Sequence, residues 1–505
     1  MSDFENEKNK SEFSLNAHKV RTNNTRKEIS ADFVLPDYMG DIKRILKYNA
    51  YVTPCNKLIS SEEASFIAIV TFRVLYIDSE DMLTEANFSQ DCEFSEKLFA
   101  DSSDADVNYK IQSVAIKLGG PRKIGAKAIV NCESSLVEAE EIHGYSEYDG
   151  AEVLKKEIEV HTVEYLKCSE REYAEEIDKI EEITSDDLEI IKSYAEAFID
   201  GIHKTDDGVN LSGYADAFCL LRGDDGIIRL EKRIPIEEHI ECITYDESAF
   251  TPKAFVTGVT VNLNNVNSDA ECAVSVVMNM TVECCLAHHY NEKVVVVEDA
   301  FFKGCKNECS YETFEYSSLG SCVTDKAPCA VNIERGEEPL HDIIERELTL
   351  KNMRYDRTGT DVTLMCDAEI HMVARGNDNE SCYTIKENFE FSKRYRLETD
   401  ENTNITINAI PCDVSVSFDS EKIYVEGQIL VSILTQKSKS AQMLTNVEYE
   451  TLEDESCSVI VYYPEKKDTL WSVSKKYGVS PSSVASRNEI SNNELSECKK
   501  IIIVK

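Results

Sequence analysis

Hydrophobic and polar residues alternate through long stretches of this chain, and the same alternating pattern occurs three times. The copies that begin at Thr71, Asp216 and Glu369 lie 145 and 153 residues apart. Each copy is followed by a turn sequence rich in Asp, Gly or Ser and then by a second alternating stretch, which predicts a β-hairpin. Period-two alternation is typical of antiparallel sheets with one buried face, so the pattern predicts three tandem β-sandwich-like repeats of about six strands each.

The repeats set the expected domain boundaries of a mainly β protein. We expect a disordered N-terminal tail over residues 1–27. The segments predicted after it are a first repeat over 28–135, a linker with a second repeat over 136–290, and a linker with a third repeat over 291–445. A short acidic segment with helix-like apolar spacing precedes each hairpin, and these three segments predict short helices: 40–46, 187–192 and 340–345.

The C-terminal residues 459–505 carry a different pattern, which predicts a small βααβ domain. An alternating run, Val459 to Tyr463, is followed by a helical apolar spacing over Leu470, Val473 and Tyr477. Asp468 or Thr469 can cap the start of that helix, and Gly478 can end it. Ser480 and Pro481 predict a second helix that closes at Arg487 and Asn488. Ile501 to Val504 predict the closing strand.

Charge narrows the classes of ligand that the protein can bind. The 505-residue chain has a formal net charge of −40 and a pI near 4.6. A surface for nucleic acid or for anionic lipid needs clustered Lys and Arg, so neither is an expected partner. Residues 459–505 carry a net charge of +3 and residues 1–458 therefore −43. The acidic body either aids solubility or steers a partner electrostatically.

The sequence also predicts where the protein resides and the state of its thiols. Residues 1–14 are polar and lack the apolar core of a signal peptide, and no run approaches the ~18 to 20 apolar residues of a membrane span. We therefore expect a cytoplasmic protein without direct membrane insertion. Its 18 cysteines are scattered, often in strand contexts, which favours reduced thiols. The spacing of Cys305, Cys309, Cys322 and Cys329 fits no familiar zinc site, so we expect no metal and no cofactor.

The chain lacks the common sequence motifs of hydrolases, nucleotide-binding enzymes and metalloproteases. It contains no nucleophile elbow, phosphate-binding loop or metalloprotease helix. His288 and His289 are adjacent in a predicted strand, so their side chains should point to opposite faces and should not share a ligand. We therefore predict no catalytic residues and no enzymatic activity.

The order of elements in residues 459–505, together with Asp468-Thr469-Leu470-Trp471 and Tyr477-Gly478-Val479, resembles a LysM domain. The resemblance implies a groove that usually holds N-acetylglucosamine units of peptidoglycan or chitin. Lys467 stands where the family usually has Gly, which changes the shape and charge of the loop. The resemblance implies a set of binding residues in two loops: Lys467, Asp468, Thr469, Leu470, Asn488, Glu489 and Ile490. We add Trp471, whose aromatic ring follows Leu470 directly.

The triplicated β pattern followed by this module resembles the architecture of sporulation proteins that combine SPOCS domains with a C-terminal LysM domain. What this resemblance implies is a spore-coat assembly protein of the mother-cell cytoplasm. Its LysM domain would bind the coat morphogenetic ATPase on the forespore surface. Two alternatives use the same groove for peptidoglycan glycan: a glycan-binding protein and a glycan hydrolase anchored by its LysM domain.

Overall fold

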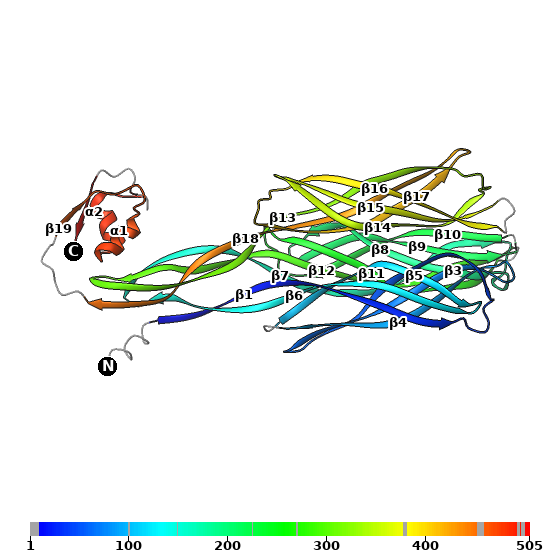
Figure 1. Ribbon diagram of the computed structural model, residues 1–505, viewed down its shortest axis with the longest axis horizontal. Helices are drawn as coiled ribbons and strands as arrows, with labels where there is room; N and C mark the ends of the chain where they lie inside the picture. Colours follow the sequence, from blue (N-terminus) through cyan, green and yellow to red (C-terminus); the bar gives the residue numbers. More distant parts are fainter. Residues whose placement is uncertain are drawn as a thin grey trace.

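The computed structural model describes residues 10–98, 102–148, 150–224, 226–268, 271–376, 381–451, 459–491, 495 and 500–505. Three β units follow one another and form one elongated body, and the small helical module lies at one end of the molecule (Figure 1). Each unit contains six strands. Those of the first are β1 (Lys10–Val34), β2 (Ile42–Ile59), β3 (Glu63–Asp78), β4 (Leu83–Lys97), β5 (Ser102–Gly120) and β6 (Lys123–Tyr148).

The second and third units repeat this order. The strands of the second are β7 (Ala151–Glu181), β8 (Glu189–Lys204), β9 (Gly208–Gly223), β10 (Gly226–Glu241), β11 (Ala249–Ser268) and β12 (Glu271–Phe302). Those of the third are β13 (Cys305–Glu334), β14 (Asp342–Thr358), β15 (Asp361–Arg375), β16 (Cys382–Arg396), β17 (Thr403–Phe418) and β18 (Lys422–Thr451).

Two antiparallel three-stranded sheets make up every unit. In the first unit their strand orders are β2-β3-β4 and β1-β6-β5, and the corresponding orders recur in the second and third units. The facing sides of the two sheets enclose a separate apolar core in each unit, with Phe66, Phe72 and Val130 among the buried residues of the first. The predicted mainly β class with antiparallel sandwich-like repeats is confirmed, as are the hairpins after Asp78, Arg222 and Arg375. Residue 225 of the second turn and residues 377–380 of the third lie outside the described residues.

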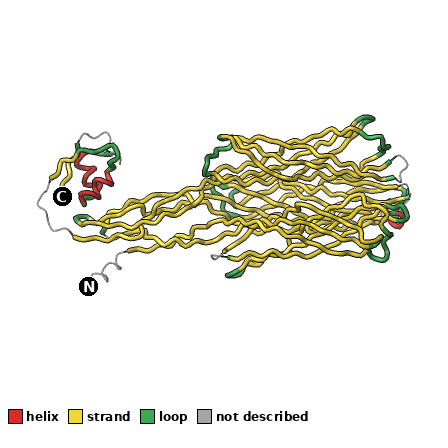
Figure 2. Tube along the Cα trace, in the orientation of Figure 1, coloured by secondary structure: helices red, strands yellow, loops and turns green. Residues whose placement is uncertain are grey.

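The long strands of each unit extend beyond the sandwiches and pack together as a stalk (Figures 1 and 2). The paired ribbons β1/β6, β7/β12 and β13/β18 form it. Small apolar clusters join ribbons from different units, for example Val294 and Val296 of β12 with Ala441 of β18. The stalk corrects three predictions. Residues 10–27 belong to β1 because they pair with β6, and the boundaries predicted after residues 135 and 290 fall inside β6 and β12.

The three predicted short helices are wrong. The segments 40–46, 187–192 and 340–345 lead into β2, β8 and β14, and the only helical piece described there is the 3₁₀ helix η2 (Ser185–Asp187). The physical reason is a β-bulge at the same place in every unit, between Ile45 and Lys47 in the first. A bulge adds one residue to a strand, which interrupts the period of two and imitates helical spacing.

The three bulges bring the units together. At each bulge an apolar residue and the charged residue after it are both buried: Leu46-Lys47, Ile191-Lys192 and Ile344-Glu345. These pairs are again 145 and 153 residues apart. The apolar members join one cluster with Leu75, Leu220 and Val373, which are likewise equivalent in the three units. The units therefore pack with approximate threefold symmetry around a shared interior.

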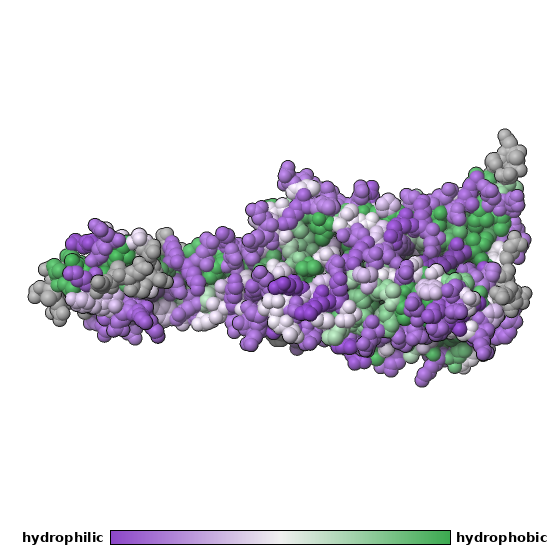
Figure 3. All heavy atoms as spheres, turned by 90° about the horizontal axis from the view of Figure 1, so that it is seen from above, coloured by the Kyte–Doolittle hydropathy of each residue, from purple (hydrophilic) through white to green (hydrophobic). Residues whose placement is uncertain are grey.

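The outer surface is mostly hydrophilic in the view of Figure 3, with hydrophobic patches between polar side chains. Among the described residues, neither α-helix has the length and hydrophobicity needed to cross a bilayer.

Candidate functional site

The C-terminal module folds as its local sequence predicts. Helix α1 (Leu470–Tyr477) begins after Thr469, whose hydroxyl oxygen accepts from the Ser472 backbone N–H at 3.0 Å, while Thr469 N donates to Ser472 Oγ at 3.0 Å. Such a cap is worth about 1 kcal/mol. The helix ends at Gly478, where a φ of 66° requires the left-handed conformation that glycine adopts without strain.

Helix α2 (Pro481–Asn488) follows with Pro481 in its first turn, and β19 (Val459–Tyr462) pairs antiparallel with β20 (Ile501–Val504). The buried core of the module includes Val473, Val484 and Ile503. Leu470 and Ile490, which the LysM resemblance places in the groove, are partly buried and pack against this core. They contribute at least part of their apolar surface to the stability of the fold.

Two other predicted groove residues hold the loops in place. The Asp468 carboxylate accepts from the backbone N–H of Glu465 at 2.8 Å and from the Tyr462 hydroxyl at 2.7 Å, and both hydrogen bonds lower the pKa of Asp468. The Asn488 side chain accepts from Ile502 N at 2.7 Å and donates to Ile502 O at 2.8 Å, so it ties the end of α2 to β20.

Lys467 and Glu489 are the predicted groove residues with exposed side chains. Glu489 follows α2 directly, in a left-handed conformation with a φ of 54°. Lys467 precedes the capping residues of α1. The loop between α2 and β20 lies largely outside the described residues, so the structure defines the α1 side of the predicted groove and only the beginning of the other side.

Trp471 faces the stalk. Its indole Nε1 donates to Asp299 Oδ2 at 2.7 Å, and its ring meets the ring of Phe301 edge-on, with 5.1 Å between centroids. Both residues belong to β12, near the tip of the stalk. The contact buries the single tryptophan of the chain partly in an interface with the body.

Lys475 of α1 strengthens the same contact. Its Nζ lies 2.5 Å from Asp299 Oδ1 and 3.2 Å from the hydroxyl oxygen of Tyr311. Burial alone would lower the pKa of Lys475, but the bonds to Asp299 and Tyr311 outweigh burial and raise it, so the ammonium stays charged. The backbone adds a bond of 3.1 Å from Gly304 N to Gly478 O. The module is therefore docked on the stalk through α1.

Sequence reasoning missed this docking contact. Asp299 and Phe301 are ordinary strand residues in an alternating pattern, and they lie more than 150 residues before the module in the sequence. A local pattern carries no signal for such a pair. Lys475 stands in the last turn of α1, where a cation is commonly found because it interacts favourably with the helix dipole.

Other candidate clusters have structural partners. His288 Nε2 lies 2.8 Å from Ser248 Oγ, whereas His289 contacts His161 and Thr251, so the two adjacent histidines do point to different partners as predicted. Among the described residues, no group of His, Cys, Asp and Glu side chains could hold a metal ion. One thiol prediction is wrong: Cys285 is disulfide-bonded, while 14 other cysteines within the described part of the chain carry free thiols.

Residues 465–503 match the LysM domain family. No curated protein and no solved structure matches the chain. The fold and the match together define a protein in which three β units of a shared topology carry a C-terminal LysM domain. The resemblance of the β units to SPOCS domains stays a prediction.

Proposed function

We propose that this protein is a non-catalytic assembly protein whose stalk holds the LysM domain in a fixed orientation. The docking of α1 through Trp471 and Lys475 on Asp299 carries the proposal, because it fixes the recognition module to a long, rigid body. An anchor that only tethers an enzyme to a wall needs no such contact. The body would then make broad contacts within an assembly, while the loops around Lys467 and Glu489 face a partner.

A protein partner is supported by the side chains that the module leaves accessible. Sugar-binding grooves commonly use aromatic rings as stacking surfaces. Trp471 contacts the stalk, and Tyr462 and Tyr477 pack against each other with 5.6 Å between centroids. Among the described residues of the module, Tyr463, which is 68% exposed, is the aromatic ring that stays accessible. The α1 side of the predicted groove instead offers the long cation Lys467. A charged loop of this kind suits an acidic protein surface. The partner implied by the resemblance is the coat morphogenetic ATPase on the forespore surface, in the mother-cell cytoplasm.

Surface plasmon resonance with the purified ATPase tests this function. The wild-type chain should bind, and Lys467→Glu should weaken binding about tenfold if the cation meets an acidic surface. Lys505→Glu is the matched control: it makes the same charge change at the opposite end of the β19/β20 pair and should leave affinity unchanged. Equal loss in both variants would mean that net charge alone governs binding and would contradict a site at Lys467.

Peptidoglycan binding is the second candidate, and the LysM family match supports it. Co-sedimentation with insoluble peptidoglycan separates the two. If the wild-type chain stays in the pellet and N-acetylglucosamine oligomers release it into the supernatant, the glycan function is favoured. If the chain stays in the supernatant and captures the ATPase, the protein-partner function is supported.

A further inference from the structure

The outer face of the β19/β20 pair is apolar and exposed. Val461 and Ile502 are cross-strand partners and therefore point to the same side of the pair, and Val459 shares that side because it lies two residues earlier. These three side chains are 41–58% exposed, and the exposed ring of Tyr463 follows them in the same alternation. The other side of the pair packs on the core of the module through Ile503. We call the four exposed residues the module face.

A second group of exposed apolar residues lies at the opposite end of the molecule, in the turn between β1 and β2 (Figure 1). Tyr38 is 84% exposed there, more than any other large apolar side chain of the described residues, and Val34 is 66% exposed. Exposed apolar residues that stand alone are ordinary, whereas groups of them mark interaction sites. We call residues 34–41 the Tyr38 turn.

The Tyr38 turn is held in one conformation. The Arg122 guanidinium donates to the carbonyl oxygens of Pro36 at 2.7 Å and of Met39 at 2.9 Å. It also lies 2.8 Å from the Asp41 carboxylate. The Met39 side chain packs against the apolar cluster beneath the turn. A partner would therefore meet a preorganised surface, which loses little conformational entropy on binding.

The charges at the two ends of the molecule are opposite in sign. Residues 34–41 and the neighbouring turn 78–82 contain five Asp or Glu residues and no Lys or Arg. Arg122 and Lys43 each pair with one of these carboxylates, so the surface around the Tyr38 turn stays negative. Residues 459–505 carry a net charge of +3 by contrast.

This difference in charge favours a second copy of the chain as the partner of the module face. Exposed Lys466 and Lys500 stand at the Tyr463 end of the face. Two copies with a net charge of −40 each repel one another over most of their surfaces, so a contact is favoured where the local charges are opposite. The module face and the Tyr38 turn meet this condition, and both also present apolar side chains.

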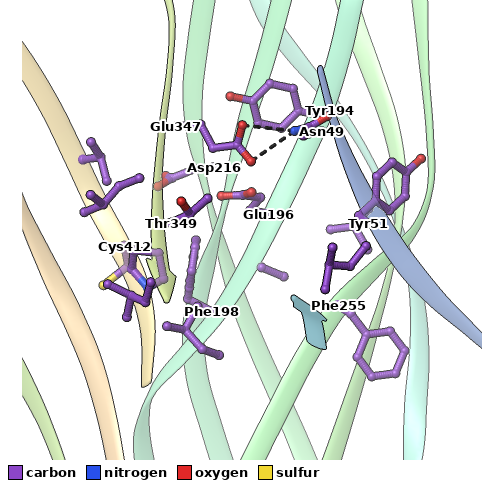
Figure 4. Close-up of a pocket in the computed structure, with 18 of the residues that line it drawn as sticks. Asn49, Tyr51, Tyr194, Glu196, Phe198, Asp216, Phe255, Glu347, Thr349 and Cys412 are labelled. Carbon is purple, nitrogen blue, oxygen red and sulfur yellow. Dashed lines mark hydrogen bonds between the residues drawn. The ribbon is translucent and has the colours of Figure 1, made fainter. Parts of the chain in front are cut away.

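The two surfaces cannot meet within one chain, because the body between them is rigid. Residues of all three units line a cavity of about 1740 Å³, and side chains connect the units there. Asn49 of β2 donates to both carboxylate oxygens of Glu347 of β14, at 3.1 Å each (Figure 4), and Lys47 lies 2.7 Å from the same carboxylate. At the other end, Trp471 fixes the module to the stalk. A contact between the two surfaces therefore joins two copies.

We propose that the module face of one copy binds the Tyr38 turn of a second copy. The two copies use different surfaces, so each pair keeps one free module face and one free Tyr38 turn. Further copies can add at both ends, and the protein forms open head-to-tail filaments along its long axis. This association does not depend on which ligand the LysM groove binds.

Sedimentation velocity of the full chain tests the contact at protein concentrations up to about 0.2 mM, because small interfaces bind weakly. The sedimentation coefficient of the wild type should rise with concentration. Val461→Asp should weaken association about tenfold or more, since it places a charge in an apolar contact, whereas Leu58→Asp at an exposed position of β2 should associate as the wild type does. A wild type that stays monomeric, or a Val461→Asp variant that associates equally well, would overturn the proposal.

A variant at the other end leaves the module intact. Tyr38→Ala removes the exposed ring and should weaken association about tenfold, while the matched control Tyr355→Ala on β14 should associate as the wild type does. If Tyr38→Ala chains associate as strongly as the wild type, module faces bind each other and the head-to-tail contact is wrong.

Mixing the two variants gives a result that only a head-to-tail contact produces. A Val461→Asp chain keeps its Tyr38 turn, and a Tyr38→Ala chain keeps its module face. An equimolar mixture should therefore form dimers and no larger species at concentrations where each variant alone is monomeric. A mixture that stays monomeric would contradict the contact.

Discussion

Replacing Glu345 by Gln should destabilise the folded protein by about 3 kcal/mol at pH 7. Glu345 lies at the bulge of β14, where the three units meet. Its carboxylate is 2.6 Å from Lys192 Nζ and 2.8 Å from Lys47 Nζ. All three side chains are buried: that of Glu345 is 2% exposed, and those of the two lysines are 3% exposed. The substitution removes the shared counter-ion of two buried ammonium groups and changes little in volume.

The magnitude follows from the pKa of Glu345. Burial would raise this pKa, but Lys192 and Lys47 lower it to about 2 from an ordinary value of 4.5. That difference corresponds to about 3 kcal/mol of extra stability for the folded state with Glu345 ionised. Removing one partner of a buried ion pair costs ~3 to 5 kcal/mol when the other charge is left without a partner. The value here lies at the low end of that range, since Lys47 keeps Glu347 at 2.7 Å and Lys192 keeps Glu85 at 3.0 Å.

The sign of the pH dependence is fixed by the lowered pKa. The folded state holds its proton on Glu345 less tightly than the unfolded chain does. The contribution is therefore complete above pH 4.5 and is lost as the pH falls toward 2. The difference in stability between the wild type and the Glu345→Gln variant should shrink over the same range.

Urea unfolding of the full chain, followed by circular dichroism, measures the effect, with Glu62→Gln as the control for net charge. The control should unfold within about 0.5 kcal/mol of the wild type, as exposed substitutions usually do. A Glu345→Gln variant that is as stable as the control at pH 7 would refute the reasoning, since it would mean that the buried ammonium groups need no shared carboxylate.

Four further predictions follow from the structure. Asp299→Ala should shift the fluorescence of the single tryptophan to longer wavelength, because Trp471 loses its partner on the stalk; Glu298→Ala should leave the emission unchanged. A chain that ends at residue 455 should keep its β-type circular dichroism and its cooperative unfolding, and loss of cooperativity would place the domain boundary elsewhere. Alkylation of the unreduced, unfolded chain followed by mass mapping should modify the 14 cysteines that carry free thiols among the described residues and leave Cys285 protected. Stability should fall as the pH drops from 6.5 toward 4, because burial lowers the pKa of His161 to about 4, and burial together with the nearby His161 lowers that of His289 to about 3. A His161→Gln variant should lose less stability over this pH range than the wild type. An equal loss of stability in both proteins would exclude His161 as a contributor.

Local structure in the C-terminal module was predictable because every signal lies within a few residues of the element that it controls. Thr469 caps the helix that it precedes, Gly478 ends that helix, and Pro481 begins the next one. The groove residues were less predictable. Asp468 and Asn488 have side chains typical of ligand contacts, but in the folded module they bond to the neighbouring loop and strand.

The sequence by itself determined the antiparallel strands, the threefold repetition and the C-terminal βααβ module, since period-two alternation and capping act over short distances along the chain. Only the tertiary structure decided how these parts combine. The polar faces of the sandwiches, which alternation alone would place in solvent, meet around a cavity lined by all three units because Leu46, Ile191 and Ile344 bury their apolar surface against one another. Residues 10–27 became a strand because β6 offers them a partner, and Trp471 turned to the stalk because Asp299 lies at its tip. Such outcomes depend on contacts between residues more than 100 positions apart, whose free energy no local pattern contains.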